Sequence, residues 1–212
     1  MEKKSSLSRA TAWYTIGNLF VRSVSFLLLP LYSNLISTEE FGRYSLVMSL
    51  YAIIAVFYQS GLQSALSKYY LEEENESRRK EIFSTIINAA GLIGITLSII
   101  IFILSGWIAL EATGTAGYSG LIRIIFASLF FETITFITLH LLRTKELARK
   151  VVVYSSFSAV VNLIFNIYLV YFLKLGIFGI IWAQLVTSVS LFFILLPFLR
   201  DSYMPRMRTD ML

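Results

Sequence analysis

Two ionisable residues fall in the middle of long apolar stretches, where a charge has to be paired or hydrated. Arg22 lies thirteen residues after Arg9, which is about 20 Å along a helix. Glu132 lies eleven residues before Arg143. A charge near the centre of a bilayer costs about 2.5–3.5 kcal/mol on insertion scales. Arg22 and Glu132 therefore either neutralise each other as a buried ion pair or serve a function in a hydrated cavity.

The functional interpretation gives these charges different chemistry. The planar guanidinium of Arg22 suits the phosphate of an anionic substrate. Glu132 could carry a proton or bind a coupling cation. The ion-pair interpretation and the functional interpretation are compatible with each other, since a substrate that breaks the ion pair would use both charges. Arg123, on the opposite side of the same expected helix, is either a second basic site or a side chain that reaches the headgroups.

Polar residues recur at helical spacing in each apolar stretch. Beside Arg22 the stripe comprises Tyr14, Asn18 and Ser25. The other stripes are Gln59 and Gln63; Ser84 and Asn88; Ser128, Glu132 and Thr135; Ser155, Ser158, Asn162 and Asn166; and Gln184 and Ser188. Hydrogen bonds between helices would explain any one of them. Together they predict a hydrated central cavity, in which Arg22, Asn18, Ser25, Asn162 and Asn166 are the candidate substrate-binding residues.

The elements that must position these residues are membrane helices. The chain is 57% hydrophobic and 15% charged, against about 45–50% and 25% in soluble domains. Spanning a bilayer takes about 20 helical residues, and six stretches reach that length. They run roughly over 11–35, 44–66, 82–103, 121–142, 151–173 and 178–199, between a short N-terminus (1–10) and a tail (200–212). We therefore expect an all-α membrane protein with six transmembrane helices.

The basic residues predict the orientation. Arg43 and Lys174 fall on one side of the membrane, whereas fourteen of the 18 Lys and Arg fall on the other. These fourteen are Lys3, Lys4, Arg9, Lys68, Arg78, Arg79, Lys80, Arg143, Lys145, Arg149, Lys150, Arg200, Arg206 and Arg208. The positive-inside rule then predicts a multi-pass membrane protein with both ends in the cytoplasm.

Composition excludes several other classes of protein. The net charge of +5 does not indicate a nucleic-acid partner, because the basic residues lie in short clusters between apolar runs. Without cysteine and with His140 as the single histidine, disulfides, thiol catalysis and Cys-based or multi-histidine metal sites are excluded. We expect no cofactor. The external loops are too short and too poor in reactive side chains for a membrane polymerase or phosphatase, so no enzyme is expected.

Several short motifs resemble a known family over the whole chain, in order. They are Leu29-Pro30-Leu31-Tyr32, Glu39-x-Phe41-Gly42-x-Tyr44, Gly61-Leu62-x-x-Ala65-Leu66, Leu142-Arg143-x-Lys145-Glu146 and Leu175-Gly176-Ile177-x-Gly179. Together they resemble the polysaccharide flippases, which export O-antigen and capsule repeat units and belong to the multidrug/oligosaccharidyl-lipid/polysaccharide exporter superfamily.

The resemblance implies a function and a partner lobe. It implies transport of an undecaprenyl-diphosphate-linked oligosaccharide from the cytoplasmic to the periplasmic leaflet of the bacterial inner membrane, for lipopolysaccharide or capsule synthesis. It also implies that arginines in the cavity, including on the first helix, hold the diphosphate. Arg22 fits that role; the resemblance assigns none to Glu132 or Arg123. Family members have two six-helix lobes that alternate access by rocking. This chain resembles the N-terminal lobe alone, so we expect a second lobe or subunit to complete the transporter, and no transport by the monomer.

Two alternatives stay open. A cation-coupled multidrug exporter of the same superfamily would favour an acidic cavity, whereas Arg22 favours an anion. A non-transporting membrane protein of the polysaccharide assembly pathway is the second alternative.

Overall fold

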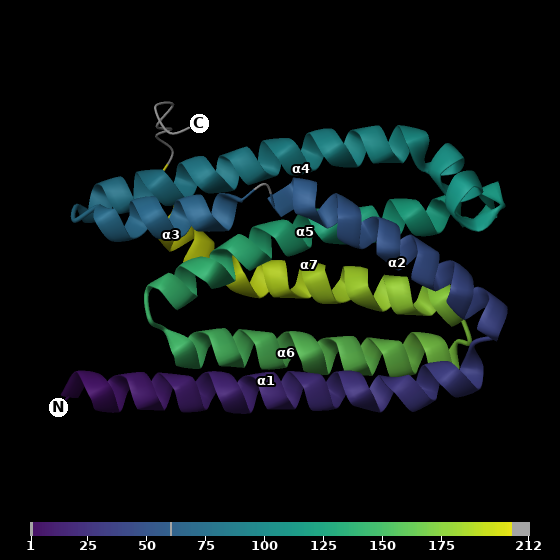
Figure 1. Ribbon diagram of the computed structural model, residues 1–212, viewed down its shortest axis with the longest axis horizontal. Coiled ribbons are helices and arrows are strands. Elements are labelled where there is room, and N and C mark those ends of the chain that lie inside the picture. The colour runs from purple at the N-terminus through teal and green to yellow at the C-terminus, as the bar shows by residue number, and fades with distance from the viewer. Residues whose placement is uncertain (1, 60, 205–212) are drawn as a thin grey trace.

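The computed structural model describes residues 2–59 and 61–204, and within them the chain is helical between short connections (Figure 1). Within these described residues, six segments are long and apolar enough to cross a membrane, which confirms the predicted fold class. They run over Thr11–Leu35, Thr38–Glu72, Glu76–Thr113, Ala116–Thr144, Ala148–Phe172 and Gly176–Ser202. Arg206 and Arg208 of the expected tail lie outside the described residues.

The first half of the chain contains α1 (Glu2–Leu35), α2 (Thr38–Gln59), α3 (Leu62–Glu72) and α4 (Glu76–Thr113). The stretch expected as one helix over 44–66 is thus two helices. Gly61 precedes α3 with φ +69°, a left-handed conformation that glycine adopts without steric cost. The Asn75 side chain caps α4 by accepting hydrogen bonds from the backbone N–H groups of Ser77 and Arg78.

The second half contains the short 3₁₀ turn η1 (Ala116–Tyr118), α5 (Ser119–Thr144), α6 (Ala148–Asn166), η2 (Ile167–Phe172) and α7 (Gly176–Ser202). The segment η2 is a π-helix that continues α6 with wider turns, so the Leu173 N–H donates to the Tyr168 carbonyl at 3.1 Å. The fifth membrane segment therefore combines α6 with a π-helical end. Turns of this kind are frequent at functional sites.

The best-packed helix is α5, which lies against both α4 and α7. Its residues Leu121, Ile122 and Ile125 are fully buried in the largest core cluster. The helices α1 and α6 form a separate layer along one side (Figure 1). Gly17 of α1 permits their close approach, because a Cβ there would lie 2.8 Å from Cγ1 of Val152.

The connections alternate between the two ends of the molecule. The N-terminus, the α3–α4 and α5–α6 turns and the C-terminal end of α7 lie at one end, and the α1–α2, α4–α5 and α6–α7 connections lie at the other (Figure 1). The clusters of basic residues in the sequence belong to the first end.

After α7 the chain turns onto α4. The backbone N–H of Met204 donates to the Ser84 hydroxyl at 2.7 Å, and the Tyr203 hydroxyl donates to Oδ1 of Asn88 at 3.1 Å. These bonds fix the segment after α7 to the first half of α4.

Candidate substrate cavity

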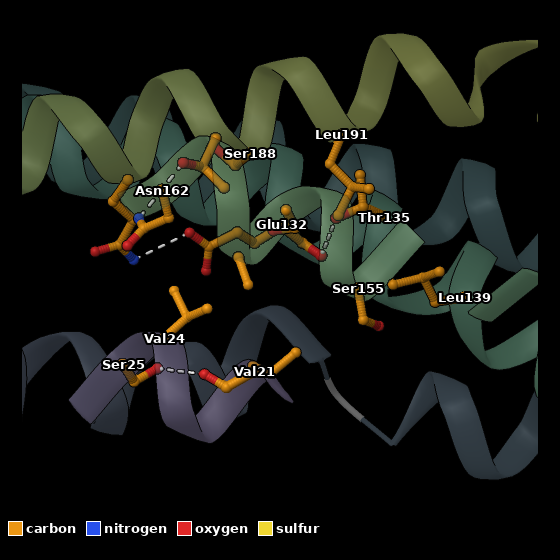
Figure 2. A pocket seen from close by; sticks show the side chains of 14 residues that line it. Val21, Val24, Ser25, Glu132, Thr135, Leu139, Ser155, Asn162, Ser188 and Leu191 are labelled. Atoms are coloured by element: carbon orange, nitrogen blue, oxygen red, sulfur yellow. Dashed lines mark hydrogen bonds between the residues drawn. The ribbon is translucent and has the colours of Figure 1, made fainter. Parts of the chain in front are cut away.

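A cavity of about 350 Å³ lies among α1, α5, α6 and α7 (Figure 2). Its polar lining residues are Ser25, Glu132, Thr135, Ser155, Ser158, Asn162, Gln184, Thr187 and Ser188, and its apolar ones are Val21, Val24, Leu139, Ala159 and Leu191. Nine of these fourteen side chains are polar, and Glu132 is the charged one among them. Polar residues from four of the six predicted stripes, on α1, α5, α6 and α7, therefore face one cavity.

The hydroxyl groups of the lining are mostly positioned by their own helices. The Ser25 hydroxyl donates to the Val21 carbonyl at 3.1 Å, and the Thr187 hydroxyl donates to the Ala183 carbonyl at 2.7 Å. Each of these oxygens keeps lone pairs that can accept a further hydrogen bond. The lining thus offers acceptors more readily than donors.

Glu132 is held on α5 by side chains from two other helices. The Tyr51 hydroxyl of α2 donates to one carboxylate oxygen, and Nε2 of Gln184 on α7 donates to the other at 3.0 Å. Figure 2 shows Glu132 between Ser188 of α7 and Ser25 of α1. Its position joins three helices at one carboxylate.

A second hollow of about 230 Å³ lies on the α2 side of Glu132. Tyr51, Gln59, Leu129, Glu132, Thr133, Thr135, Phe136 and Leu139 line it. Glu132, Thr135 and Leu139 therefore line both hollows. A carboxylate between two hollows is well placed to exchange a proton or a cation with either.

A chain of amide and hydroxyl groups connects α1, α6 and α7. The Tyr32 hydroxyl donates to Oδ1 of Asn166 at 2.7 Å, and Nδ2 of Asn166 donates to Oδ1 of Asn162 at 3.0 Å. The amide of Asn162 in turn donates to the Thr187 hydroxyl at 3.4 Å. Of the two predicted asparagines, Asn162 therefore lines the cavity, whereas Asn166 is buried behind it and positions it.

Comparison with known proteins now identifies the class. The sequence pattern of the family described as polysaccharide biosynthesis protein matches residues 7–211, nearly the whole chain. The chain belongs to this family. Among curated proteins, none matches the sequence significantly.

Solved structures show the same fold. A MATE protein in complex with MaD3S superposes with a TM-score of 0.76 at 18% identity, covering 93% of this chain and 46% of that one. An outward-facing multidrug resistance MATE transporter of the MOP superfamily gives 0.72 at 16% identity, covering 95% and 47%. A MOP superfamily transporter from Pyrococcus furiosus, described as having a binding pocket of reverse polarity, gives 0.71 at 16% identity with the same coverage.

The chain therefore spans about half the length of these transporters. It has the fold of one lobe and fits the N-terminal half, as the family resemblance implied. The family is therefore that of polysaccharide biosynthesis proteins, and the fold is the one seen in one half of these MATE and MOP superfamily transporters.

The predicted site residues on α1 lie at the edge of the cavity. Ser25 lines it, but Arg22 and Asn18 are exposed and are not among its lining residues. Arg22 precedes Ser25 by three residues, so its side chain points roughly 60° further round the helix. Within the described residues no ion pair joins Arg22 to Glu132. The proposed buried pair does not form: Arg22 is exposed, and Glu132 accepts hydrogen bonds from Tyr51 and Gln184 instead.

Arg123 lies on the seam between α4 and α5. Its Nε donates to the buried Ser105 hydroxyl at 2.8 Å, and its guanidinium lies 4.5 Å from the centre of the Phe102 ring. Arg123 is not among the lining residues of the cavity around Glu132. Its partners are those of a side chain that holds two helices together.

Sequence reasoning missed Tyr51 as a site residue. The signal was a tyrosine deep in an apolar stretch, since a buried hydroxyl needs a hydrogen-bond partner. Gln184 was recognised as polar, but its partner could not be read from spacing alone. In the described part of the chain, no three His, Asp or Glu side chains gather closely enough to hold a metal ion.

Proposed function

We propose that this chain is the N-terminal six-helix lobe of a flippase for undecaprenyl-diphosphate-linked oligosaccharide, acting in lipopolysaccharide O-antigen or capsule synthesis. Membership of the polysaccharide biosynthesis family supports the substrate class, and the MOP transporter fold supports translocation. The coverage of about half of the solved transporters supports a second six-helix lobe or subunit as partner. Alternating access would then come from rocking of the two lobes.

The observation that carries the proposal is the neutral polar lining of the cavity. Nine of its fourteen lining side chains are polar, and eight of the nine are uncharged Ser, Thr, Asn or Gln. Small-molecule pockets are more commonly lined by hydrophobic and aromatic side chains with a few polar groups. A lining rich in hydroxyl and amide groups suits the hydroxyl groups of a sugar.

The exposed Arg22 supplies the complementary charge for the lipid end of the substrate. Its guanidinium can bind a phosphate through two parallel hydrogen bonds. Arg22 and Asn18 lie on the surface of the lobe, next to Ser25 at the cavity. We assign the diphosphate to Arg22 and Asn18 and the sugars to Ser25 and Asn162, with Asn166 positioning Asn162.

The orientation forms part of the same proposal. The α3–α4 and α5–α6 turns lie at the same end of the molecule (Figure 1), and clusters of Lys and Arg fall in or beside these turns in the sequence. The positive-inside rule assigns that end to the cytoplasm. Substrate would therefore enter from the cytoplasmic leaflet of the inner membrane and leave toward the periplasm.

We assign the coupling of transport to a proton or cation to Glu132. Its carboxylate reaches two hollows and receives hydrogen bonds from Tyr51 and Gln184. Binding or release of a proton or cation would alter these bonds and so change the contacts among α2, α5 and α7. Arg123 remains a candidate secondary basic site at the other end of α5.

Complementation of a flippase-deficient strain by the complete gene tests the proposal. Arg22→Ala should abolish most glycan export, and Arg22→Lys should restore part of it, because lysine keeps the charge but loses the two-pronged geometry. Arg149→Ala, which removes an exposed arginine from the start of α6, is the matched control and should export normally. Normal export in Arg22→Ala would remove Arg22 from the substrate site.

A cation-coupled multidrug exporter is the second candidate, favoured by the carboxylate of Glu132 in the cavity and by the likeness to MATE structures. Expression in a drug-sensitive strain separates the two. Resistance that is lost in Glu132→Gln, without complementation of glycan export, would favour drug export. If the chain supports neither glycan export nor drug resistance, a non-transporting member of the assembly pathway is favoured.

A further inference from the structure

A separate hollow of about 710 Å³ lies between α3 and the last turns of α5. Gln63, Ser64, Ser67, Lys68, Leu71, Glu72 and His140 line it. It shares no lining residue with the cavity around Glu132. The proposed transport site gives it no role.

The polar wall of this hollow is fixed in place by packing behind it. Leu66 and Tyr70 on the inner face of α3 are buried against α4 and α5. The Ser67 hydroxyl and Nε2 of His140 lie 2.6 Å apart, in a hydrogen bond that joins α3 to α5. The outer face of α3, with Ser64 and Lys68, is therefore held open toward the surroundings.

Two opposite charges stand one helical turn apart on that face. Lys68 and Glu72 are four residues apart, so their side chains lie on the same side of α3. Both are exposed, and within the described residues neither belongs to an ion pair. Lys68 Nζ instead lies 5.5 Å from the centre of the Tyr69 ring. An ammonium and a carboxylate thus face the same hollow without neutralising each other directly.

The sequence around α3 predicts that the hollow lies near the level of the lipid headgroups. The segment Thr38–Glu72 is apolar enough to cross a membrane, and α3 forms its last part. Directly after α3 the chain becomes highly charged, from Glu73 to Lys80. Leu71, which is 64% exposed, lines the same hollow and offers an apolar surface to an acyl chain.

We propose that this hollow binds the phosphoethanolamine headgroup of a membrane phospholipid. Lys68 and the hydroxyl and amide groups of Ser64 and Gln63 would bind the phosphate, and Glu72 would accept hydrogen bonds from the primary ammonium. The two charges of this headgroup are separated by two carbon atoms, which matches charges one turn apart. An anionic headgroup fits less well because Glu72 would repel it, and a choline headgroup has no N–H to donate.

Lipid retention by the purified full chain tests the proposal. Native mass spectrometry would compare phosphatidylethanolamine, phosphatidylcholine and phosphatidylglycerol with the same acyl chains at equal concentration. We expect the ethanolamine lipid to be retained in preference to the other two. Lys68→Ala should lower its retention about fivefold, the effect of one lysine at a membrane surface. Glu72→Gln should remove the preference for ethanolamine over choline.

The matched controls are Lys80→Ala and Glu74→Gln, which remove exposed charges of the same sign just outside the hollow. They should retain lipid like the unmodified chain. Equal retention of ethanolamine and choline lipids, or an equal effect of Lys68→Ala and Lys80→Ala, would overturn the proposal. An unchanged thermal midpoint in each variant checks that folding is intact.

Two competitors separate a lipid from a soluble ligand. Millimolar inorganic phosphate or glycerophosphoethanolamine should not displace the lipid, because neither has acyl chains to contact Leu71. Displacement by phosphate alone would assign the hollow to free phosphate and refute the lipid headgroup.

Discussion

The helices α5 and α6 both cross the membrane, yet the chain buries them very differently. Of the most apolar window of each segment, 56% is buried in the segment that contains α5 and 11% in the segment that contains α6. Their mean hydropathies are nearly equal, at 1.8 and 1.6. Hydropathy therefore does not distinguish the central helix from the peripheral one, because lipid tails are as apolar as a protein core.

The two helices therefore contribute differently to the cavity. The central helix α5 fixes Glu132 among partners from α2 and α7. The peripheral helix α6 brings Ser155, Ser158 and Asn162 to the cavity while most of its surface stays uncovered by this chain. The packed helix thus holds the charged group, and the exposed layer of α1 and α6 is the side left free for lipid or for a partner lobe.

The largest effect on stability is expected from a comparison of one isoleucine in each helix. Ile125 of α5 is 0% exposed, and Ile164 of α6 is 56% exposed. Ile125→Ala should lower the free energy of unfolding by about 2–5 kcal/mol, because it leaves a cavity in the core. Ile164→Ala should change it by less than about 0.5 kcal/mol. Unfolding by SDS in mixed micelles measures both. Equal losses would mean that the outer face of α6 is packed as tightly as α5.

The next effect concerns the seam between α1 and α6. A Cβ on Gly17 would lie 2.8 Å from Cγ1 of Val152, so Gly17→Ala should cost about 1–3 kcal/mol through overpacking. Gly91→Ala in α4 is the control, since apart from its chain neighbours and the adjacent backbone of its own helix no atom lies within 4 Å of the added carbon. It should be neutral or stabilise the helix by up to about 1 kcal/mol. A harmless Gly17→Ala would show that the two helices can move apart freely.

A smaller effect is expected at the carboxylate on α5. Tyr51→Phe removes the hydroxyl that donates to Glu132. The loss of stability should reach at most about 1.7 kcal/mol, the upper end for polar pairs between membrane helices. Tyr171→Phe, at an exposed position, should have no effect on the same unfolding measurement. If both variants behave alike, the bond to Glu132 does not stabilise the central helix.

The smallest effect is expected at the polar contact between α1 and α6. The Tyr32 hydroxyl donates to Asn166 at 2.7 Å, and Tyr32→Phe should cost about 0.6 kcal/mol, the average for such pairs. The double variant with Asn166→Ala should lose less than the sum of the single losses. Strict additivity would indicate that the two side chains do not stabilise each other.

Much of the lobe could be predicted from the sequence because its pattern is local. The length of the apolar stretches set the six segments, and the recurrence of Ser, Asn and Gln every three or four residues indicated an inward face. Ser25, Asn162, Gln184 and Ser188, each from one of these stripes, line the cavity around Glu132, whereas Arg22, Asn18 and Asn166 do not. The positive clusters indicated which connections share one side.

Pairings between helices could not be predicted in this way. Spacing placed Arg22 and Glu132 at similar depth, but depth does not determine the direction in which a side chain points. Arg22 is exposed on α1, and the Tyr51 hydroxyl of α2 reaches Glu132 of α5. Both depend on packing among helices distant in sequence. The break between α2 and α3 could more easily have been predicted from the sequence, since Gly61 lies at it.

The attachment of Tyr203 and Met204 to α4 has a mechanical consequence. Two hydrogen bonds join the segment after α7 to Ser84 and Asn88. When α4 tilts, this segment has to travel with it, whereas a tilt of α7 alone must break both bonds or bend the backbone at Ser202. The position of the segment after α7 therefore depends on the tilt of α4, a helix that does not line the cavity around Glu132.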